Sequence, residues 1–116
     1  MPNVIIYHNP NCAKSREALE LIRSRGIEPH IIEYLKTPLT VESLTEVLNL
    51  LQENVMHLFR ENEPLFKELK LADRQLNKEQ FLAEIVKHPI LLQRPIVING
   101  HRAIIARPPE KVLSIL

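Results

Sequence analysis

The chain has 116 residues, with fifteen lysines and arginines against fourteen aspartates and glutamates, so its formal net charge is +1. This length fits a single compact domain over residues 1–116. Because both signs of charge are spread along the chain, we expect no surface for nucleic acid or for anionic lipid, and any anion site must be local. The apolar runs are short and the first residues lack a basic segment, so we expect neither a membrane span nor a signal peptide.

A single cysteine, Cys12, is the most informative residue of the composition. One thiol cannot form a disulfide within the chain, and the sequence predicts a cytoplasmic protein in which this thiol is kept reduced. We expect no bound cofactor and no metal site. The composition therefore draws attention to the chemistry of one free thiol.

The first third of the sequence predicts a strand, a helix and a second strand. Residues 3–7 form a short run rich in β-branched side chains before a His-Asn-Pro-Asn turn. Residues 15–25 carry apolar side chains at helical spacing, and Gly26 fits a C-terminal cap. Residues 30–35 predict the second strand, and a strand-helix-strand unit of this length implies parallel pairing with a right-handed crossover.

The middle of the chain, over about 40–88, predicts a helical insertion. Its apolar residues recur at helical spacing, and several polar residues fit helix caps. The expected features are, in chain order, a helix after the N-cap Thr40, shorter helical pieces over 54–70 interrupted by Pro64, and a helix over 78–88 that an Asn77–Gln80 capping box opens and Pro89 ends.

The last third predicts a β-hairpin followed by a helix. Residues 95–98 and 102–105 are apolar runs separated by an Asn-Gly turn signal, and residues 107–116 have prolines at the start and one apolar face. The resulting order is βαβ, helices, then ββα. It predicts an α/β fold of the thioredoxin-like class, with a mixed four-stranded sheet and the helical insertion between the two halves.

Cys12 lies at or just before the N-terminus of the first predicted helix. There the free backbone N–H groups and the helix dipole favour a thiolate. A cysteine with a pKa of about 8.5 is only slightly ionised at neutral pH, so further help is needed. Ser15 is a candidate to donate its hydroxyl to the sulfur, and His8 to act if protonated. The polar turn before Cys12 and Lys14 after it argue against an inert core thiol.

The residues that follow Cys12 exclude two other thiol chemistries. A dithiol oxidoreductase needs a second cysteine where this chain has Ser15, and a tyrosine-phosphatase-like loop needs an arginine where it has Ala18. Cys12 must therefore be regenerated by an external thiol.

Three arginines are candidate ligands for an oxyanion, although each taken alone is most simply a solvated charge. Arg94 and Arg107 each precede a proline, and Arg60 lies in the predicted insertion. In a thioredoxin-like topology the loop before the third strand carries a proline, commonly with a cis bond, beside the active-site cysteine. We therefore expect Arg94 close to Cys12, where a guanidinium binds an oxyanion in a bidentate way.

Three separated blocks of the sequence resemble the glutaredoxin-linked arsenate reductases, a family with a thioredoxin-like fold and a helical insertion. The similarity covers nearly the whole chain in order, and the chain resembles the shorter, chromosomal-type members. Lys14 departs from the family pattern, in which that place usually holds a small residue. The blocks are IYHNPNCAKSREALELI, LFRENEPLFKELKL and HPILLQRPIVINGHRAIIARPPEKVL.

The resemblance implies a role for individual residues. The family's nucleophile matches Cys12, its histidine that helps to activate the thiol matches His8, and its Ser-Arg pair matches Ser15 and Arg16. The arginines that bind the oxyanion in the family match Arg60, Arg94 and Arg107.

The resemblance also implies a reaction. Arsenate held by the arginines is attacked by the Cys12 thiolate with loss of water, and glutathione, as co-substrate, attacks the adduct and reduces arsenic(V) to arsenic(III). Glutaredoxin then resolves the mixed disulfide between Cys12 and glutathione. The expected partners are arsenate, glutathione and glutaredoxin.

Two other functions stay open on the sequence. A monothiol, glutathione-dependent disulfide reductase would use the same Cys12 without needing Arg60. A redox regulator similar to the Spx proteins would share the fold and bind RNA polymerase, but those proteins usually carry a Cys-x-x-Cys switch, which is absent here.

Overall fold

The computed structural model describes residues 3–116, so the first two residues of the predicted domain lie outside the described part. The chain divides into two compact units. The first comprises Met1–Thr37 with Arg94–Leu116, and the second is Pro38–Gln93. Within residues 3–116, no helix has the length and apolar character needed to cross a bilayer.

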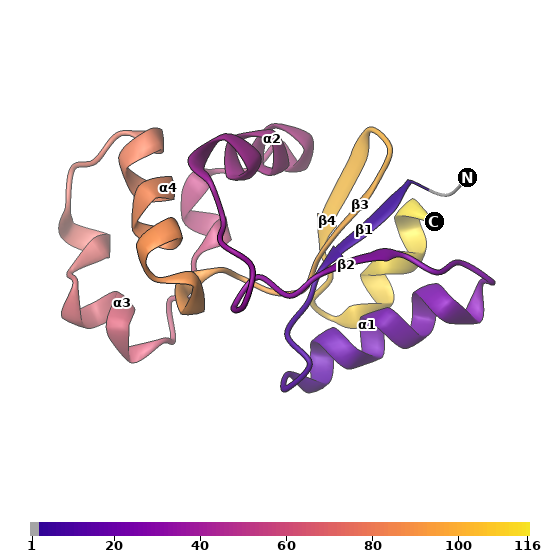
Figure 1. The fold of residues 1–116 in the computed structure, drawn as a ribbon. Helices are drawn as coiled ribbons and strands as arrows, with labels where there is room; N and C mark the ends of the chain where they lie inside the picture. The colour runs from indigo at the N-terminus through magenta and orange to yellow at the C-terminus, as the bar shows by residue number, and fades with distance from the viewer. Residues whose placement is uncertain (1–2) are drawn as a thin grey trace. The chain divides into compact units, whose positions relative to one another are not determined.

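The first unit is built on a four-stranded mixed sheet (Figure 1). Its spatial order is β2-β1-β3-β4; β1 runs parallel to β2, whereas β3 is antiparallel to both β1 and β4. This arrangement confirms the predicted α/β class with its βαβ and ββα halves. The strands are β1 (Val4–Tyr7), β2 (His30–Ile32), β3 (Ile96–Asn99) and β4 (Arg102–Ile105).

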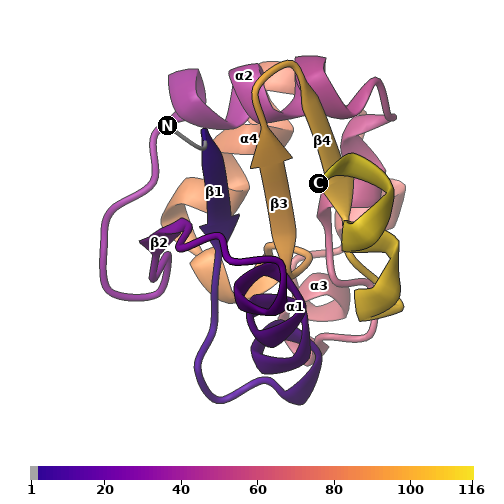
Figure 2. The same ribbon diagram turned by 90° about the vertical axis from the view of Figure 1, so that its right-hand side faces the viewer.

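Two helices cover one face of this sheet, α1 (Ala13–Ser24) and the 3-10 helix η4 (Pro109–Ile115) (Figure 2). Between them and the strands lies a core of small and branched apolar side chains. Because this core includes residues from β1, α1, β3 and η4, it holds α1 against the sheet. Its buried members are Val4, Ile6, Ala18, Leu19, Ile22, Val97, Ala106, Val112 and Ile115.

The start of α1 differs from the prediction in a way that matters for the thiol. The helix begins at Ala13 rather than at residue 15, because Cys12 itself is the N-cap and its carbonyl accepts the Arg16 N–H at 3.0 Å. The second strand is also shorter than predicted. It ends at Ile32, since the Glu33 carbonyl accepts the N–H groups of residues 36 and 37 and turns the chain.

The predicted hairpin is confirmed, and the final helix is of a different kind from that expected. Asn99 pairs with Arg102 across a two-residue loop, in which Gly100 has φ of +62°, a value that suits glycine. The last element winds as a 3-10 helix from Pro109, not as an α-helix from residue 107.

The second unit is helical, as the sequence predicts, and its caps are confirmed. Thr40 accepts the Ser43 N–H, and the Asn77–Gln80 capping box is formed. Pro64 begins a helix rather than interrupting one, because its missing N–H costs nothing at the first helical position. The elements are α2 (Val41–Leu51), η1 (Val55–Leu58), α3 (Pro64–Glu68), η2 (Leu71–Asp73), α4 (Lys78–Lys87) and η3 (Pro89–Leu91).

An aromatic cluster and a short backbone bridge organise the second unit around residue 59. The Phe59 ring lies 5.7 Å from that of Phe66 and 5.9 Å from that of Phe81, measured between ring centroids. Phe59 also forms an antiparallel bridge with Leu92. This bridge fixes the backbone at the residue that follows, Arg60, whose N–H donates to the Leu91 carbonyl at 2.8 Å.

Candidate active site

Cys12 occupies the N-cap of α1 at the end of a tight turn. Its N–H donates to the Asn9 carbonyl at 3.0 Å, closing the turn Asn9-Pro10-Asn11-Cys12. The backbone of Cys12 is extended, as is usual at an N-cap, and the N–H groups of Lys14 and Ser15 in the first turn of the helix help to lower the pKa of its thiol. These two N–H groups occupy the positions that bind a capping oxygen in an ordinary N-cap.

The surroundings of Cys12 lower the pKa of its thiol below the ordinary value. Burial alone would raise this pKa, but it is outweighed by the Ser15 N–H, the charge of Arg94, a hydrogen bond from the Arg94 side chain, and the Lys14 N–H. Because its pKa is lowered, the thiol ionises more readily than a free cysteine. Because it is only partly buried, it is also open to a reactant.

Ser15 supports the site in a way that differs from the sequence-based expectation. Its side chain is fully buried, and its hydroxyl shares a hydrogen bond of 2.7 Å with Nδ1 of His8 and accepts the Asn9 N–H at 3.1 Å. The group of Ser15 that acts on the sulfur is therefore its backbone N–H, not its hydroxyl. The reason is that the hydroxyl points back into the loop that precedes the helix.

His8 is buried directly after β1. Burial lowers the pKa of His8 from its ordinary value; the charge of Glu33 opposes this, while those of Arg23 and Arg16 reinforce it. The imidazole is therefore mainly neutral at pH 7, so the protonated form considered from the sequence is the minor one. The contact that the structure does form joins His8 to Ser15.

Two of the three candidate arginines belong to the same unit as Cys12. Arg94 is half-buried and acts on the thiol through both its charge and a hydrogen bond, so the predicted proximity of Arg94 and Cys12 is found. Arg107 donates a hydrogen bond of 3.0 Å to the Arg94 carbonyl. Both arginines precede cis prolines. The structure thus places Arg94 beside the thiol, and it places the Arg107 guanidinium against the backbone of Arg94.

Arg60 lies in the second unit, directly after the Phe59–Leu92 bridge. Its guanidinium is 3.1 Å from the Glu63 carboxylate and 3.4 Å from the Ile90 carbonyl. Its participation in the oxyanion site stays a prediction.

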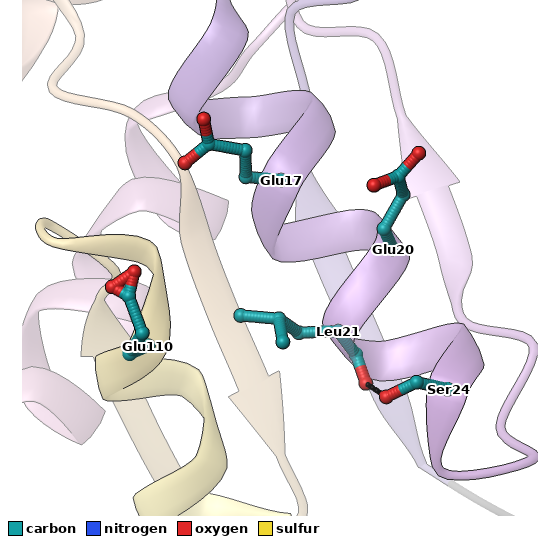
Figure 3. Close-up of a pocket in the computed structure, with 5 residues that line it drawn as sticks. All are labelled: Glu17, Glu20, Leu21, Ser24 and Glu110. Atoms are coloured by element: carbon teal, nitrogen blue, oxygen red, sulfur yellow. Dashed lines mark hydrogen bonds between the residues drawn. The ribbon is translucent and has the colours of Figure 1, made fainter.

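A separate hollow of about 390 Å³ lies between α1 and η4 (Figure 3). Leu21 lines it, and carboxylates from both helices surround it: Glu17 and Glu20 from α1, and Glu110 from η4. Like charges repel, so this hollow disfavours an oxyanion, in contrast to the surroundings of Cys12. Among residues 3–116, no three His, Cys, Asp or Glu side chains gather as a metal site would require.

The family model described as ArsC family matches residues 7–115 of the chain. The chain belongs to the ArsC family. The matched range contains the Cys12 turn, Arg94 and Arg107, together with the whole second unit. This assignment confirms the family resemblance inferred from the three sequence blocks.

Relatives and solved structures agree with the assignment over almost the full chain. Uncharacterized protein YfgD of Escherichia coli K12 is 46% identical over 97% of this chain and 96% of its own. A protein of Haemophilus influenzae named Arsenate reductase is 44% identical over 98% of this chain and 99% of its own. The structure described as Arsenate reductase from Vibrio cholerae is 46% identical over 99% of this chain and 98% of its own, with a TM-score of 0.95.

The sequence analysis did not predict two contacts at the site, one made by Asn9 and one made by Arg16, although Arg16 itself matches the family's Ser-Arg pair. The Asn9 side chain accepts the Asn11 N–H at 3.0 Å, and Arg16 donates to the Pro10 carbonyl at 2.9 Å. An asparagine directly before a proline is a signal for the first of these contacts, because its side chain often caps the turn that the proline begins. Nothing local in the sequence indicates the second.

Proposed function

We propose that this protein is an arsenate reductase in which Cys12 is the nucleophile. The observation that carries the proposal is the thiol itself, held at the N-terminus of α1 with a lowered pKa and in contact with the Arg94 guanidinium. An ionised sulfur beside a cation suits attack on a bound oxyanion. The names of several relatives with more than 40% identity, such as the Haemophilus protein, support arsenate as that oxyanion.

In this proposal the arginines bind the substrate before the thiolate attacks it. The Arg107 guanidinium is bonded to the backbone of Arg94, so both positive charges belong to one short region of the chain, and positive charge there favours an anion. The family resemblance assigns Arg60 to the same role, and that role stays a prediction; in the structure the Arg60 guanidinium lies 3.1 Å from the Glu63 carboxylate. Holding the arsenic close to the sulfur supplies much of the rate enhancement by proximity.

The first chemical step forms a sulfur–arsenic bond. The Cys12 thiolate attacks arsenate, one arsenate oxygen takes up protons and leaves as water, and arsenic stays in the +5 state. The N–H groups of Lys14 and Ser15 stabilise the thiolate before the attack. The lowered pKa keeps a larger fraction of Cys12 reactive at neutral pH than a free thiol would have.

The second step transfers two electrons to arsenic. The sulfur of glutathione bonds to the Cys12 sulfur, the electron pair of the sulfur–arsenic bond remains on arsenic, and arsenite leaves after taking up protons. Cys12 is then joined to glutathione in a mixed disulfide, which glutaredoxin reduces by thiol–disulfide exchange. A chain with a single cysteine fits this scheme, since both other thiols come from outside. Glutathione is abundant in the cytoplasm, where we place the protein.

His8 and Ser15 support the nucleophile rather than contact the arsenic in this proposal. The buried His8–Ser15 hydrogen bond holds the end of β1 to the first turn of α1. Ser15 in turn presents its N–H to the sulfur. The neutral imidazole thus acts through Ser15, not by its charge.

The test is arsenite formation by the purified protein with arsenate, glutathione and glutaredoxin, measured beside Cys12→Ser. We expect turnover in the wild type and none in the variant. Asn11→Ala, which changes the exposed turn but not the sulfur, is the matched control and should keep full activity. If the folded wild type reduces a glutathione mixed disulfide but forms no arsenite, the monothiol disulfide reductase is correct and the present proposal is wrong.

A further inference from the structure

Asn9 uses three of its polar groups to build the turn that carries Cys12. Its carbonyl accepts the Cys12 N–H at 3.0 Å, and its side-chain Oδ1 accepts the Asn11 N–H at 3.0 Å. Its own N–H donates to the Ser15 hydroxyl at 3.1 Å. One residue therefore connects the middle of the turn, the end of the turn and the first turn of α1.

The Oδ1 contact is the only one of the three that depends on the identity of the side chain. It orients the peptide between Pro10 and Asn11, whereas any residue at position 9 supplies a backbone carbonyl and N–H. Asn11 takes part through its backbone, so its own side chain is not needed for this contact. A second tie comes from Arg16, whose guanidinium holds the Pro10 carbonyl at 2.9 Å.

We propose that Asn9 is a positioning residue for the reaction: its side chain fixes the turn that places the sulfur of Cys12 over the first turn of α1. With the turn fixed, the sulfur stays within reach of the Lys14 and Ser15 N–H groups and of Arg94. Without the Oδ1 contact the turn samples other conformations, and the sulfur spends less time at the helix N-terminus. Asn9 acts through Cys12 and is not required to contact arsenate.

The test compares Cys12 alkylation by iodoacetamide, a neutral reagent, as a function of pH. We expect Asn9→Ala to lower the rate at about pH 6.5, relative to the rate at about pH 9.5, by about threefold, because the hydrogen bonds that favour the thiolate are weakened. Asn9→Gln extends the amide beyond its acceptor geometry and should behave like Asn9→Ala. Asn9→Ser retains a side-chain acceptor for the turn and should recover part of the loss.

Asn11→Ala is the matched control, since it alters the same exposed turn but keeps the backbone N–H that Asn9 binds. Its pH profile should equal that of the wild type. Using a ratio of two rates removes any difference in the folded fraction, which would lower both rates together. An unchanged profile in both Asn9→Ala and Asn9→Gln overturns the proposal, as does an Asn9→Ser profile no better than that of Asn9→Ala.

This inference rests on the proposed function only in taking Cys12 as the reacting group. Alkylation involves no arsenate, so a failure here is distinct from a failure of the arsenate reductase proposal. In the coupled assay, a positioning role predicts that Asn9→Ala lowers kcat by about threefold at neutral pH and leaves the half-maximal arsenate concentration unchanged. A rise in that concentration with kcat unchanged would instead assign Asn9 to substrate binding.

Discussion

The guanidinium of Arg107 donates a hydrogen bond of 3.0 Å to the backbone carbonyl of Arg94. Arg94 in turn acts on Cys12 through its charge and a side-chain hydrogen bond. One arginine is thus attached to the backbone of the other, at the point where the chain enters β3. An oxyanion site built this way has coupled parts, so its arginines should not behave as independent ligands.

Arg94→Ala should impair both the thiol and substrate binding. We expect the pKa of Cys12 to rise, because the charge and hydrogen bond that lower it are removed. The half-maximal arsenate concentration should rise by more than about tenfold, because losing a charged bidentate contact weakens binding by about that factor. An alkylation profile and the coupled arsenite assay measure the two effects. Arg94→Lys keeps the positive charge but not the planar guanidinium. Compared with Arg94→Ala, it should bring the pKa of Cys12 close to its wild-type value but should recover little of the arsenate affinity.

Arg107→Ala should weaken arsenate binding partly through Arg94. Because the two residues are in contact, the loss in the double variant Arg94→Ala, Arg107→Ala should be smaller than the sum of the losses in the single variants. The half-maximal arsenate concentrations of the four proteins, expressed as free energies, give the coupling. Additive losses would mean that the hydrogen bond between Arg107 and the Arg94 carbonyl has no role in binding.

Arg60→Ala should raise the half-maximal arsenate concentration by about tenfold and leave the alkylation profile of Cys12 unchanged. The groups that set the pKa of Cys12 are its own burial, Arg94 and two N–H groups of α1, and Arg60 is not among them. Arg60→Lys tests whether a positive charge at this position is enough for arsenate binding, without the planar guanidinium. A variant that binds arsenate as well as the wild type would remove Arg60 from the site.

Stability should depend on the ionisation of Cys12. The pKa of this thiol is lower in the folded protein than its ordinary value of about 8.5, so the fold favours the thiolate. The associated stabilisation is fully present above the ordinary pKa and is lost as the pH falls through the lowered folded value. Urea unfolding of the wild type and Cys12→Ser at several pH values measures it. The free energy of unfolding of the wild type, relative to that of Cys12→Ser, should increase as the pH rises. A difference in free energy that does not depend on pH would contradict the account.

The sequence predicts the elements that depend on local patterns. The hairpin at Asn99-Gly100, the N-cap at Thr40 and the Asn77–Gln80 capping box are all confirmed, because each depends on residues adjacent in the chain. Cys12 at the N-terminus of α1 was predictable for the same reason. The proximity of Arg94 to Cys12 required knowledge of the thioredoxin-like topology in addition to the local pattern.

What the sequence could not predict depends on the directions of side chains in the folded structure. The Ser15 hydroxyl was expected at the sulfur, yet it bonds to His8 and to the Asn9 N–H, since the loop before α1 folds back over it. Spacing shows that Ser15 is near Cys12 but not which of its polar groups faces the sulfur. The tie between Arg16 and Pro10 also depends on this fold of the loop and has no signal of its own.

The most direct test of the account omits glutaredoxin and follows Cys12 by mass spectrometry in the presence of glutathione, with and without arsenate. The reaction should then stop after arsenic is reduced, leaving Cys12 joined to glutathione only in the samples that contain arsenate. Phosphate, which has a similar shape but cannot accept the electrons, is the matched control and should give no adduct. An adduct that forms equally without arsenate, or none at all from a protein with a reactive thiol, would contradict the proposed role of Cys12.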